Sequence, residues 1–84
     1  MPNPFRDKTS FVVTTNEEAG IEIWITDLLG HDVWHQKNSG NLPSGTHTFD
    51  FDANSLTQGM YQYRIQISGS SKVSTETGKL ILEK

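Results

Sequence analysis

Asp50, Asp52 and Asn54 stand at alternate positions, which is the spacing of the first ligands of a calcium-binding loop. An EF-hand loop also needs a glycine at its sixth position and a bidentate glutamate at its twelfth. In this chain those positions hold Ser55 and Tyr61. We therefore predict that the segment ends a strand, that Asp52 and Asn54 cap the turn after it, and that no calcium binds there.

The remaining polar side chains do not form a recognisable catalytic or metal site. His31 and His35 lie four residues apart, which on a strand separates them by about 13 Å, too far to share one zinc ion. The chain has no cysteine, no Gly-x-Ser-x-Gly nucleophile motif and no glycine-rich phosphate loop. We expect no enzymatic activity, no metal and no cofactor.

The two tryptophans, Trp24 and Trp34, are the other candidates for binding. Aromatic rings on the outer face of a β-sandwich stack on sugars, so a carbohydrate-binding module is one alternative. The other interpretation is a cross-strand aromatic pair, which would add only about 0.5–1 kcal/mol to stability. Both interpretations depend on how the surrounding hairpin is paired.

That hairpin can be predicted in detail. Residues 27–31 fit a type I turn in which Gly30 takes the left-handed position of a G1 bulge. Asp27 would then pair with His31, and counting outward would pair Ile25 with Val33 and Trp24 with Trp34. The two tryptophans would form an aromatic platform on the outer face.

Alternation of apolar and polar residues with a period of two runs through the whole chain. It predicts strands near residues 9–15, 21–26, 32–35, 46–51 and 60–67, and a last strand over 73–83 that is broken near Gly78. Six or seven short strands with frequent turns indicate an all-β, immunoglobulin-like antiparallel sandwich. The spacing Leu56-x-x-Gly59-x-Tyr61 resembles a tyrosine corner, in which the tyrosine hydroxyl reaches back to the upstream backbone where the chain crosses between sheets.

Composition limits the function further. The 84 residues make one domain, residues 1–84, and the net charge of −3 comes without a basic stripe, so we expect no nucleic-acid binding. No apolar run approaches the roughly 20 residues that span a bilayer, so we expect no membrane insertion. Met1 is followed directly by Pro-Asn-Pro-Phe, with no signal peptide. As written, the chain could not direct its own export, so we expect that it is either cytoplasmic or cut from a longer protein and given a start methionine.

Five short motifs in order resemble the type A C-terminal sorting domain of the type IX (Por) secretion system. They are Pro2-Asn3-Pro4-Phe5; Asp27-x-x-Gly30; Leu42-x-x-Gly45-x-His47; Leu56-x-x-Gly59-x-Tyr61-x-Tyr63-Arg64; and Lys79-Leu80-Ile81-Leu82-x-Lys84. The family often has tyrosine where Thr26 stands, arginine where His31 stands and tryptophan where Phe51 stands. An Ig-like domain of flagellar hook-capping proteins shares part of the pattern.

The resemblance implies that the domain is a sorting signal and catalyses no reaction itself. Such a domain follows an N-terminal cargo protein, passes through the periplasm, and is recognised by the outer-membrane translocon, which exports the cargo to the cell surface or the extracellular space. The resemblance therefore implies that residues 1–84 were excised from the C-terminus of a larger secreted protein. A sortase then usually removes the domain, and the cargo is commonly attached to surface lipopolysaccharide. A carbohydrate-binding module, or a structural Ig-like or fibronectin-like module of a secreted enzyme, remains the alternative.

We expect the recognition surface on the last strand, residues 79–84, with the corner at Gly59 and Tyr61 holding it in place. A strand at a sheet edge can accept a partner's strand and can also support a weak homodimer. The residues predicted to take part in sorting are Pro2, Asn3, Pro4, Phe5, Gly30, Gly45, Gly59, Tyr61, Lys79, Leu80, Ile81, Leu82 and Lys84.

Overall fold

The computed structural model describes residues 6–38 and 40–83, which form strands and turns without a helix. The strands are β1 (Lys8–Thr15), β2 (Ala19–Thr26), β3 (Asp32–Lys37), β4 (Gly45–Asp52), β5 (Gly59–Gly69) and β6 (Val73–Leu82). The predicted sorting residues Pro2, Asn3, Pro4, Phe5 and Lys84 lie outside the described residues. Within that part of the chain no helix is long and apolar enough to cross a membrane.

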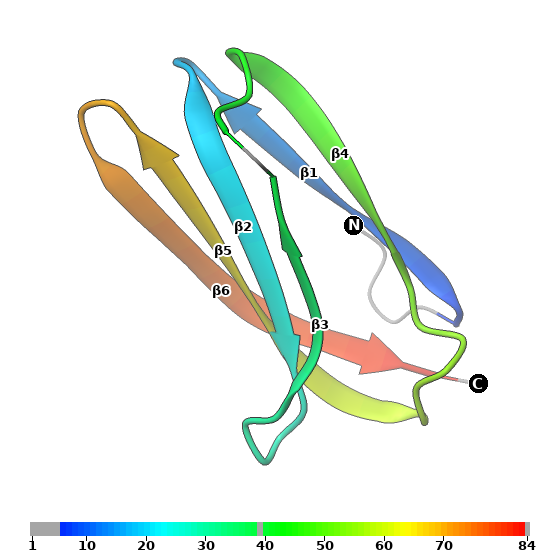
Figure 1. Cartoon of the computed structure of the whole chain (residues 1–84). Helices are drawn as coiled ribbons and strands as arrows, with labels where there is room; N and C mark the ends of the chain where they lie inside the picture. Colours follow the sequence, from blue (N-terminus) through cyan, green and yellow to red (C-terminus); the bar gives the residue numbers. More distant parts are fainter. Residues whose placement is uncertain (1–5, 39, 84) are drawn as a thin grey trace.

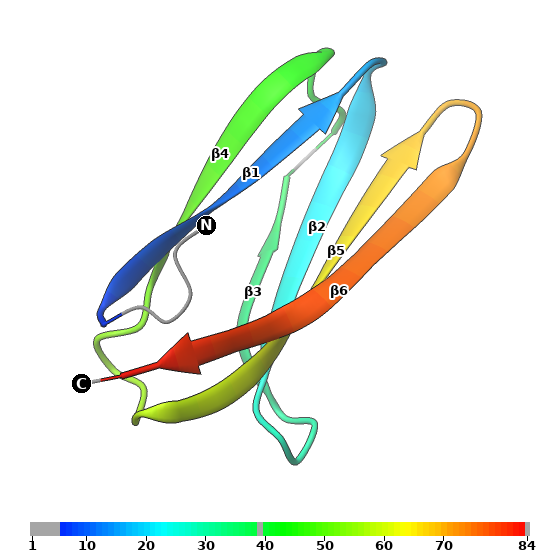
Figure 2. The same cartoon turned by 180° about the vertical axis from the view of Figure 1, so that it is seen from behind.

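The strands form two antiparallel sheets packed face to face (Figure 1). One sheet has the order β3-β2-β5-β6 and the other consists of β1 and β4. The chain crosses from one sheet to the other after β1, after β3 and after β4. The predicted immunoglobulin-like all-β sandwich is confirmed. In Figure 2, β6 lies at the edge of the four-stranded sheet, next to β5, and its C-terminal end turns toward the beginning of β1.

Alternating side chains build the core between the two sheets, as the period of two predicts. Ile21, Ile23 and Ile25 of β2 are at most 3% exposed, whereas the residues between them are half-buried. The other buried core side chains come from β1, β4, the crossover loop, β5 and β6: Phe11, Val13, Phe49, Phe51, Ala53, Tyr61, Ile65, Leu80 and Leu82. Most side chains on the outer faces are polar.

The β2–β3 hairpin has the predicted turn but a different register. Gly30 has a φ of +89°, the amide of Gly30 donates to the Asp27 carbonyl at 3.1 Å, and the amide of Asp27 donates to the His31 carbonyl at 3.0 Å. Thr26 faces Asp32, as counting outward from the pair of Asp27 and His31 predicts, but a β-bulge comes next, so that Ile25 faces Trp34. The turn prediction is confirmed, and the predicted pairing of Ile25 with Val33 is wrong.

The bulge has a physical reason. One extra residue in β3 reverses the side of every later residue, so Trp34 turns inward. Its ring packs between the sheets, with ring centroids 5.1 Å from Phe51 and 6.5 Å from Phe11. Val33 is also packed against the core. The bulge therefore lets two consecutive apolar side chains contact the core, which strict alternation would prevent.

The predicted break in the last strand is also wrong. β6 runs without interruption through Gly78, which faces Tyr63 across the β5–β6 ladder. The Tyr63 ring lies over this glycine, and a Cβ added there would lie 2.5 Å from two ring carbons and from the hydroxyl oxygen of Tyr63. Gly78 thus makes room for a neighbouring aromatic side chain. A glycine inside a strand pattern can therefore mark close packing of a neighbour as well as a break in the strand.

Candidate recognition surface

The tyrosine corner is formed as the sequence predicts. The Tyr61 hydroxyl donates a 2.6 Å hydrogen bond to the Thr57 carbonyl, and the Tyr61 side chain is only 7% exposed. Gly59 has a φ of +151°, a conformation that favours glycine. The amide of Leu56 donates to the Ala53 carbonyl at 3.0 Å, which tightens the same loop. The corner therefore fixes where β5 begins after the crossing from β4.

The corner is joined directly to the last strand. Gly59 faces Leu82 and Tyr61 faces Leu80 in the β5–β6 ladder, so two of the predicted sorting motifs are cross-strand partners. Leu80 and Leu82 are 0% and 1% exposed. These two leucines therefore serve the core, and any partner must contact other residues of this strand.

The side chains that alternate with the two leucines point to the outer face. Ile81 faces Met60, and Lys79 faces Gln62, across the same ladder. Ile81 is 37% and Met60 39% exposed, and the other two side chains are also exposed. We call Met60, Gln62, Lys79 and Ile81 the closing-strand surface. It combines an apolar pair, an amide and a cation on the outer face at the C-terminal end of β6.

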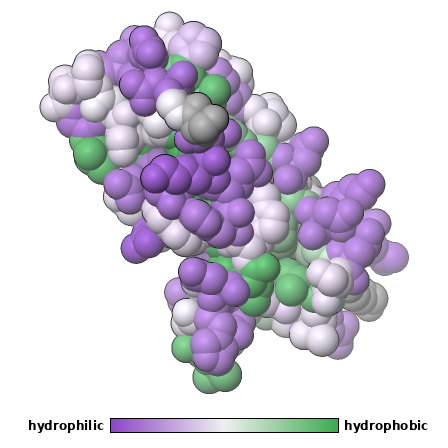
Figure 3. All heavy atoms as spheres, in the orientation of Figure 1, coloured by the Kyte–Doolittle hydropathy of each residue, from purple (hydrophilic) through white to green (hydrophobic). Residues whose placement is uncertain are grey.

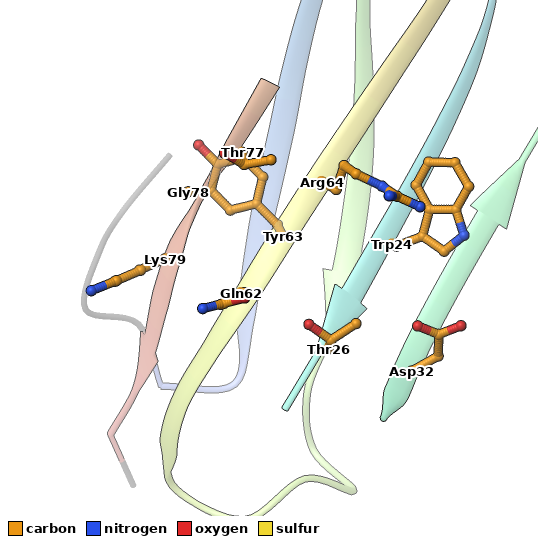
Figure 4. Close-up of a pocket in the computed structure, with 9 residues that line it drawn as sticks. All are labelled: Trp24, Thr26, Asp32, Gln62, Tyr63, Arg64, Thr77, Gly78 and Lys79. Carbon is orange, nitrogen blue, oxygen red and sulfur yellow. The ribbon is translucent and has the colours of Figure 1, made fainter. Parts of the chain in front are cut away.

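A shallow groove of about 540 Å³ continues from this surface across the outer face of the four-stranded sheet (Figure 4). Its lining comprises Trp24, Thr26, Asp32, Gln62, Tyr63, Arg64, Thr77, Gly78 and Lys79. The Arg64 side chain reaches from β5 to the indole of Trp24, with the guanidinium carbon 4.2 Å from the ring centroid. The cation therefore lies over the ring in a cation–π contact.

The ring of Trp24 also has a neighbour on its other flank. His35, on β3, stacks on it with ring centroids 5.4 Å apart, and its Nε2 lies 2.5 Å from a carboxylate oxygen of Glu22. Arg64 and His35 come from the strands on either side of β2. The predicted aromatic platform of Trp24 and Trp34 is therefore wrong, because the two rings lie on opposite faces of the sheet. The Trp24 ring instead lies between Arg64 and His35.

The turn at Asp27 is held mainly by that residue's carboxylate. One oxygen accepts hydrogen bonds from the amides of Leu29 and His31, each at 2.9 Å, and the other lies 3.3 Å from the His31 ring. The hydrogen bond from the His31 backbone, together with that from Leu29 and the His31 charge, outweighs the opposing effect of desolvation and lowers the pKa of Asp27 below 3.8. Asp27 is thus ionised at neutral pH.

The Leu-x-x-Gly-x-His motif has a structural explanation. Leu42 exchanges two backbone hydrogen bonds with Ala19 of β2, of 2.7 and 3.0 Å. The Nε2 of His47 donates to the Pro43 carbonyl at 2.7 Å, and Gly45 between them has a φ of +132°. A carbonyl can only accept, so Nε2 carries a proton. These contacts determine how the chain enters β4.

The carboxylates considered for calcium form hydrogen bonds within the fold. Asp50 accepts a 2.9 Å hydrogen bond from the Ser10 hydroxyl of β1, and Asp52 accepts one of 2.9 Å from the amide of Asn54, which confirms the part of the predicted cap that Asp52 provides. Among the described residues, no three His, Cys, Asp or Glu side chains lie close enough to hold a metal ion.

One contact was not predicted from the sequence. Glu17, in the β1–β2 turn, accepts hydrogen bonds from the amide and hydroxyl of Ser71 in the β5–β6 turn, at 3.3–3.4 Å. Gly69 allows this approach, since a Cβ there would overlap the Glu17 carboxylate. Glu17 and Ser71 are 54 positions apart, and no local spacing reveals such a contact.

Comparison with known proteins gives one clear result. No curated protein and no solved structure matches the chain. The family model for the secretion system C-terminal sorting domain matches residues 1–83. This family acts as a sorting signal for type IX secretion, attached to a cargo protein and recognised by that system, and it is not a catalytic family. The chain belongs to the family of type IX secretion C-terminal sorting domains, which direct attached cargo to the cell surface or the extracellular space.

Proposed function

We propose that the closing-strand surface is the part of this sorting domain that the outer-membrane translocon recognises after the cargo has reached the periplasm. The observation that carries the proposal is the pairing of Gly59 with Leu82 and of Tyr61 with Leu80. This pairing supports the view that alternate residues of β6 have different roles. The buried leucines hold the strand on the corner, and the side chains that alternate with them are presented outward.

The chemistry of the surface suits a protein partner. Ile81 and Met60 offer apolar area at one end of the patch, and Lys79 offers a charge at the other. β6 is also an end strand of the four-stranded sheet, and end strands are where partner proteins commonly add to a sheet. In this proposal the domain supplies recognition only, and the translocon and a sortase perform export and cleavage.

Deleting residues 80–84 is a poor test, because it removes two fully buried leucines and would unfold the domain. The sharper variant is the double substitution Lys79→Glu with Ile81→Thr, which changes the outer face alone. We expect a reporter cargo fused to this variant to remain in the periplasm, while the melting temperature of the purified domain stays close to that of the wild type.

The matched control is Val73→Thr with Thr75→Glu. These two residues are exposed and lie on the same face of the same strand, at its other end. The control fusion should reach the cell surface normally. Normal surface delivery of the Lys79→Glu, Ile81→Thr fusion would rule out the proposal.

A further inference from the structure

The tip of the β2–β3 hairpin exposes two consecutive leucines. Leu28 is 64% and Leu29 82% exposed, which makes Leu29 the most exposed large apolar side chain among the described residues. In Figure 3, hydrophobic atoms lie at the lower end of the molecule, where this hairpin ends in Figure 1. Single exposed apolar residues are common, but an adjacent pair at a protruding turn needs an explanation.

The turn holds these leucines in a fixed geometry. Two backbone hydrogen bonds close it, between Asp27 and Gly30 and between Asp27 and His31, and the Asp27 carboxylate accepts two more from the amides of Leu29 and His31. Gly30 takes the left-handed conformation that the turn requires. A partner that buries the leucines would therefore lose little backbone entropy on binding.

The tip lies at the same end of the four-stranded sheet as the closing-strand surface. Thr26, the last residue before the turn, faces Gln62, and Gln62 in turn faces Lys79. These residues form one row across β2, β5 and β6. A partner protein seated on the closing-strand surface can thus extend along this end of the sheet to the hairpin tip.

The charges around the leucines select the kind of partner. Asp27 at the base of the turn is ionised at neutral pH, and the exposed Asp32 lies just after the turn. Two carboxylates beside an apolar tip disfavour contact with the anionic surface of a bilayer, and they complement a basic rim around an apolar pocket.

We infer that the hairpin tip is a second docking element, in which Leu28 and Leu29 enter an apolar pocket with a basic rim on the protein of the type IX system that also contacts the closing-strand surface. The inference rests on the proposed function and adds to it the chemistry of the partner. Burial of the two leucines would contribute to the affinity in proportion to the apolar area that leaves water.

The test is the double variant Leu28→Ser with Leu29→Ser in a cargo fusion. We expect surface delivery, and binding to the partner, to fall by about tenfold or more. The matched control is Val12→Ser with Val73→Ser, since these valines are 61% and 62% exposed and lie away from the tip. The control should be delivered normally, and both variants should keep the wild-type melting temperature.

Cross-linking distinguishes the partners. A photo-reactive amino acid at Leu29 should join the domain to the same envelope protein as one placed at Lys79, whereas one at Val12 should not. Co-sedimentation with vesicles of phosphatidylethanolamine and phosphatidylglycerol should be equal for the wild type and the Leu28→Ser, Leu29→Ser variant. Leucine-dependent vesicle binding, with cross-links at Leu29 to lipid alone, would overturn the inference in favour of a membrane contact.

The outcomes separate the inference from the proposed function. If Leu28→Ser, Leu29→Ser is delivered normally while Lys79→Glu, Ile81→Thr is retained, the hairpin tip is no docking element and the closing-strand surface stands. If both variants are delivered normally, both ideas are wrong.

Discussion

Tyr61→Phe is the substitution that tests most directly whether the corner supports the rest of the domain. It removes one hydroxyl and keeps the ring in the core. The lost interaction is the 2.6 Å hydrogen bond to the Thr57 carbonyl. A neutral hydrogen bond contributes about 0.5–1.5 kcal/mol, and the exposed Thr57 allows water to reach its carbonyl after the substitution. We therefore expect the free energy of unfolding to fall by about 1 kcal/mol.

This loss is measurable against the stability of a small domain. An 84-residue domain is stable by about 4–13 kcal/mol, and urea slopes for small proteins begin near 1 kcal/mol per molar. The urea midpoint should thus fall by about 0.7–1 M with an unchanged slope. Tryptophan fluorescence reports the transition, because Trp34 lies between the sheets against Phe51 and leaves this environment on unfolding.

Tyr63→Phe is the matched control. Tyr63 is two residues further along the same strand, on the same face, and its ring packs against Phe11 with centroids 5.3 Å apart. Its ring packing is unchanged by loss of the hydroxyl, so its stability should stay within about 0.5 kcal/mol of the wild type. Equal losses in the two variants, or no loss in Tyr61→Phe, would refute a supporting role for the corner.

Other contacts make three further predictions testable. Gly78→Ala should lower the free energy of unfolding by about 1–3 kcal/mol, because its Cβ would overlap the Tyr63 ring; urea unfolding checks this, and an unchanged midpoint would show that the ring moves aside freely. Trp34→Ala should lower the free energy of unfolding by roughly 3 kcal/mol, which is at the low end for aromatic truncations because the side chain is half-buried. Trp24→Ala should lower it by roughly 1 kcal/mol. Thermal melts in which Trp24→Ala is the less stable variant would contradict the described register. Because the pKa of Asp27 is lower in the folded state than its ordinary value of 3.8, ionisation of Asp27 stabilises the fold at pH values above 3.8. This contribution disappears as the pH falls through the lower pKa of the folded state. The stability difference between the wild type and Asp27→Asn should therefore be larger near neutral pH than in acid, and a constant difference across the titration would refute this reasoning.

Local patterns in the sequence were sufficient to predict the strands and most turns. The alternation of Ile21, Ile23 and Ile25 identifies the buried face of β2, and the spacing from Gly59 to Tyr61 identifies the corner, because both depend on geometry over a few residues. The turn at Gly30 could be predicted for the same reason, because its geometry also depends on a few neighbouring residues.

The register after that turn could not be predicted in the same way. A bulge leaves the turn intact and shifts only the later residues of the strand, so its cause lies in the opposite sheet, where Phe11 and Phe51 offer space to Trp34. The consecutive apolar pair Val33-Trp34 is the one local signal of the bulge. Gly78 shows the same limit, since its partner Tyr63 is known only once β5 and β6 are aligned.

The place of β6 in the order of the strands has a consequence for synthesis. Leu80 and Leu82 complete the core, yet they come after every other core residue along the chain. A chain that emerges from the ribosome or from a membrane channel with its N-terminus first cannot close this sandwich until Leu82 has emerged. A cargo chain interrupted before that point carries an open domain whose corner lacks its cross-strand partners. The folded domain thus reports that translation has reached its last strand, and export that requires the folded domain would discriminate against truncated cargo.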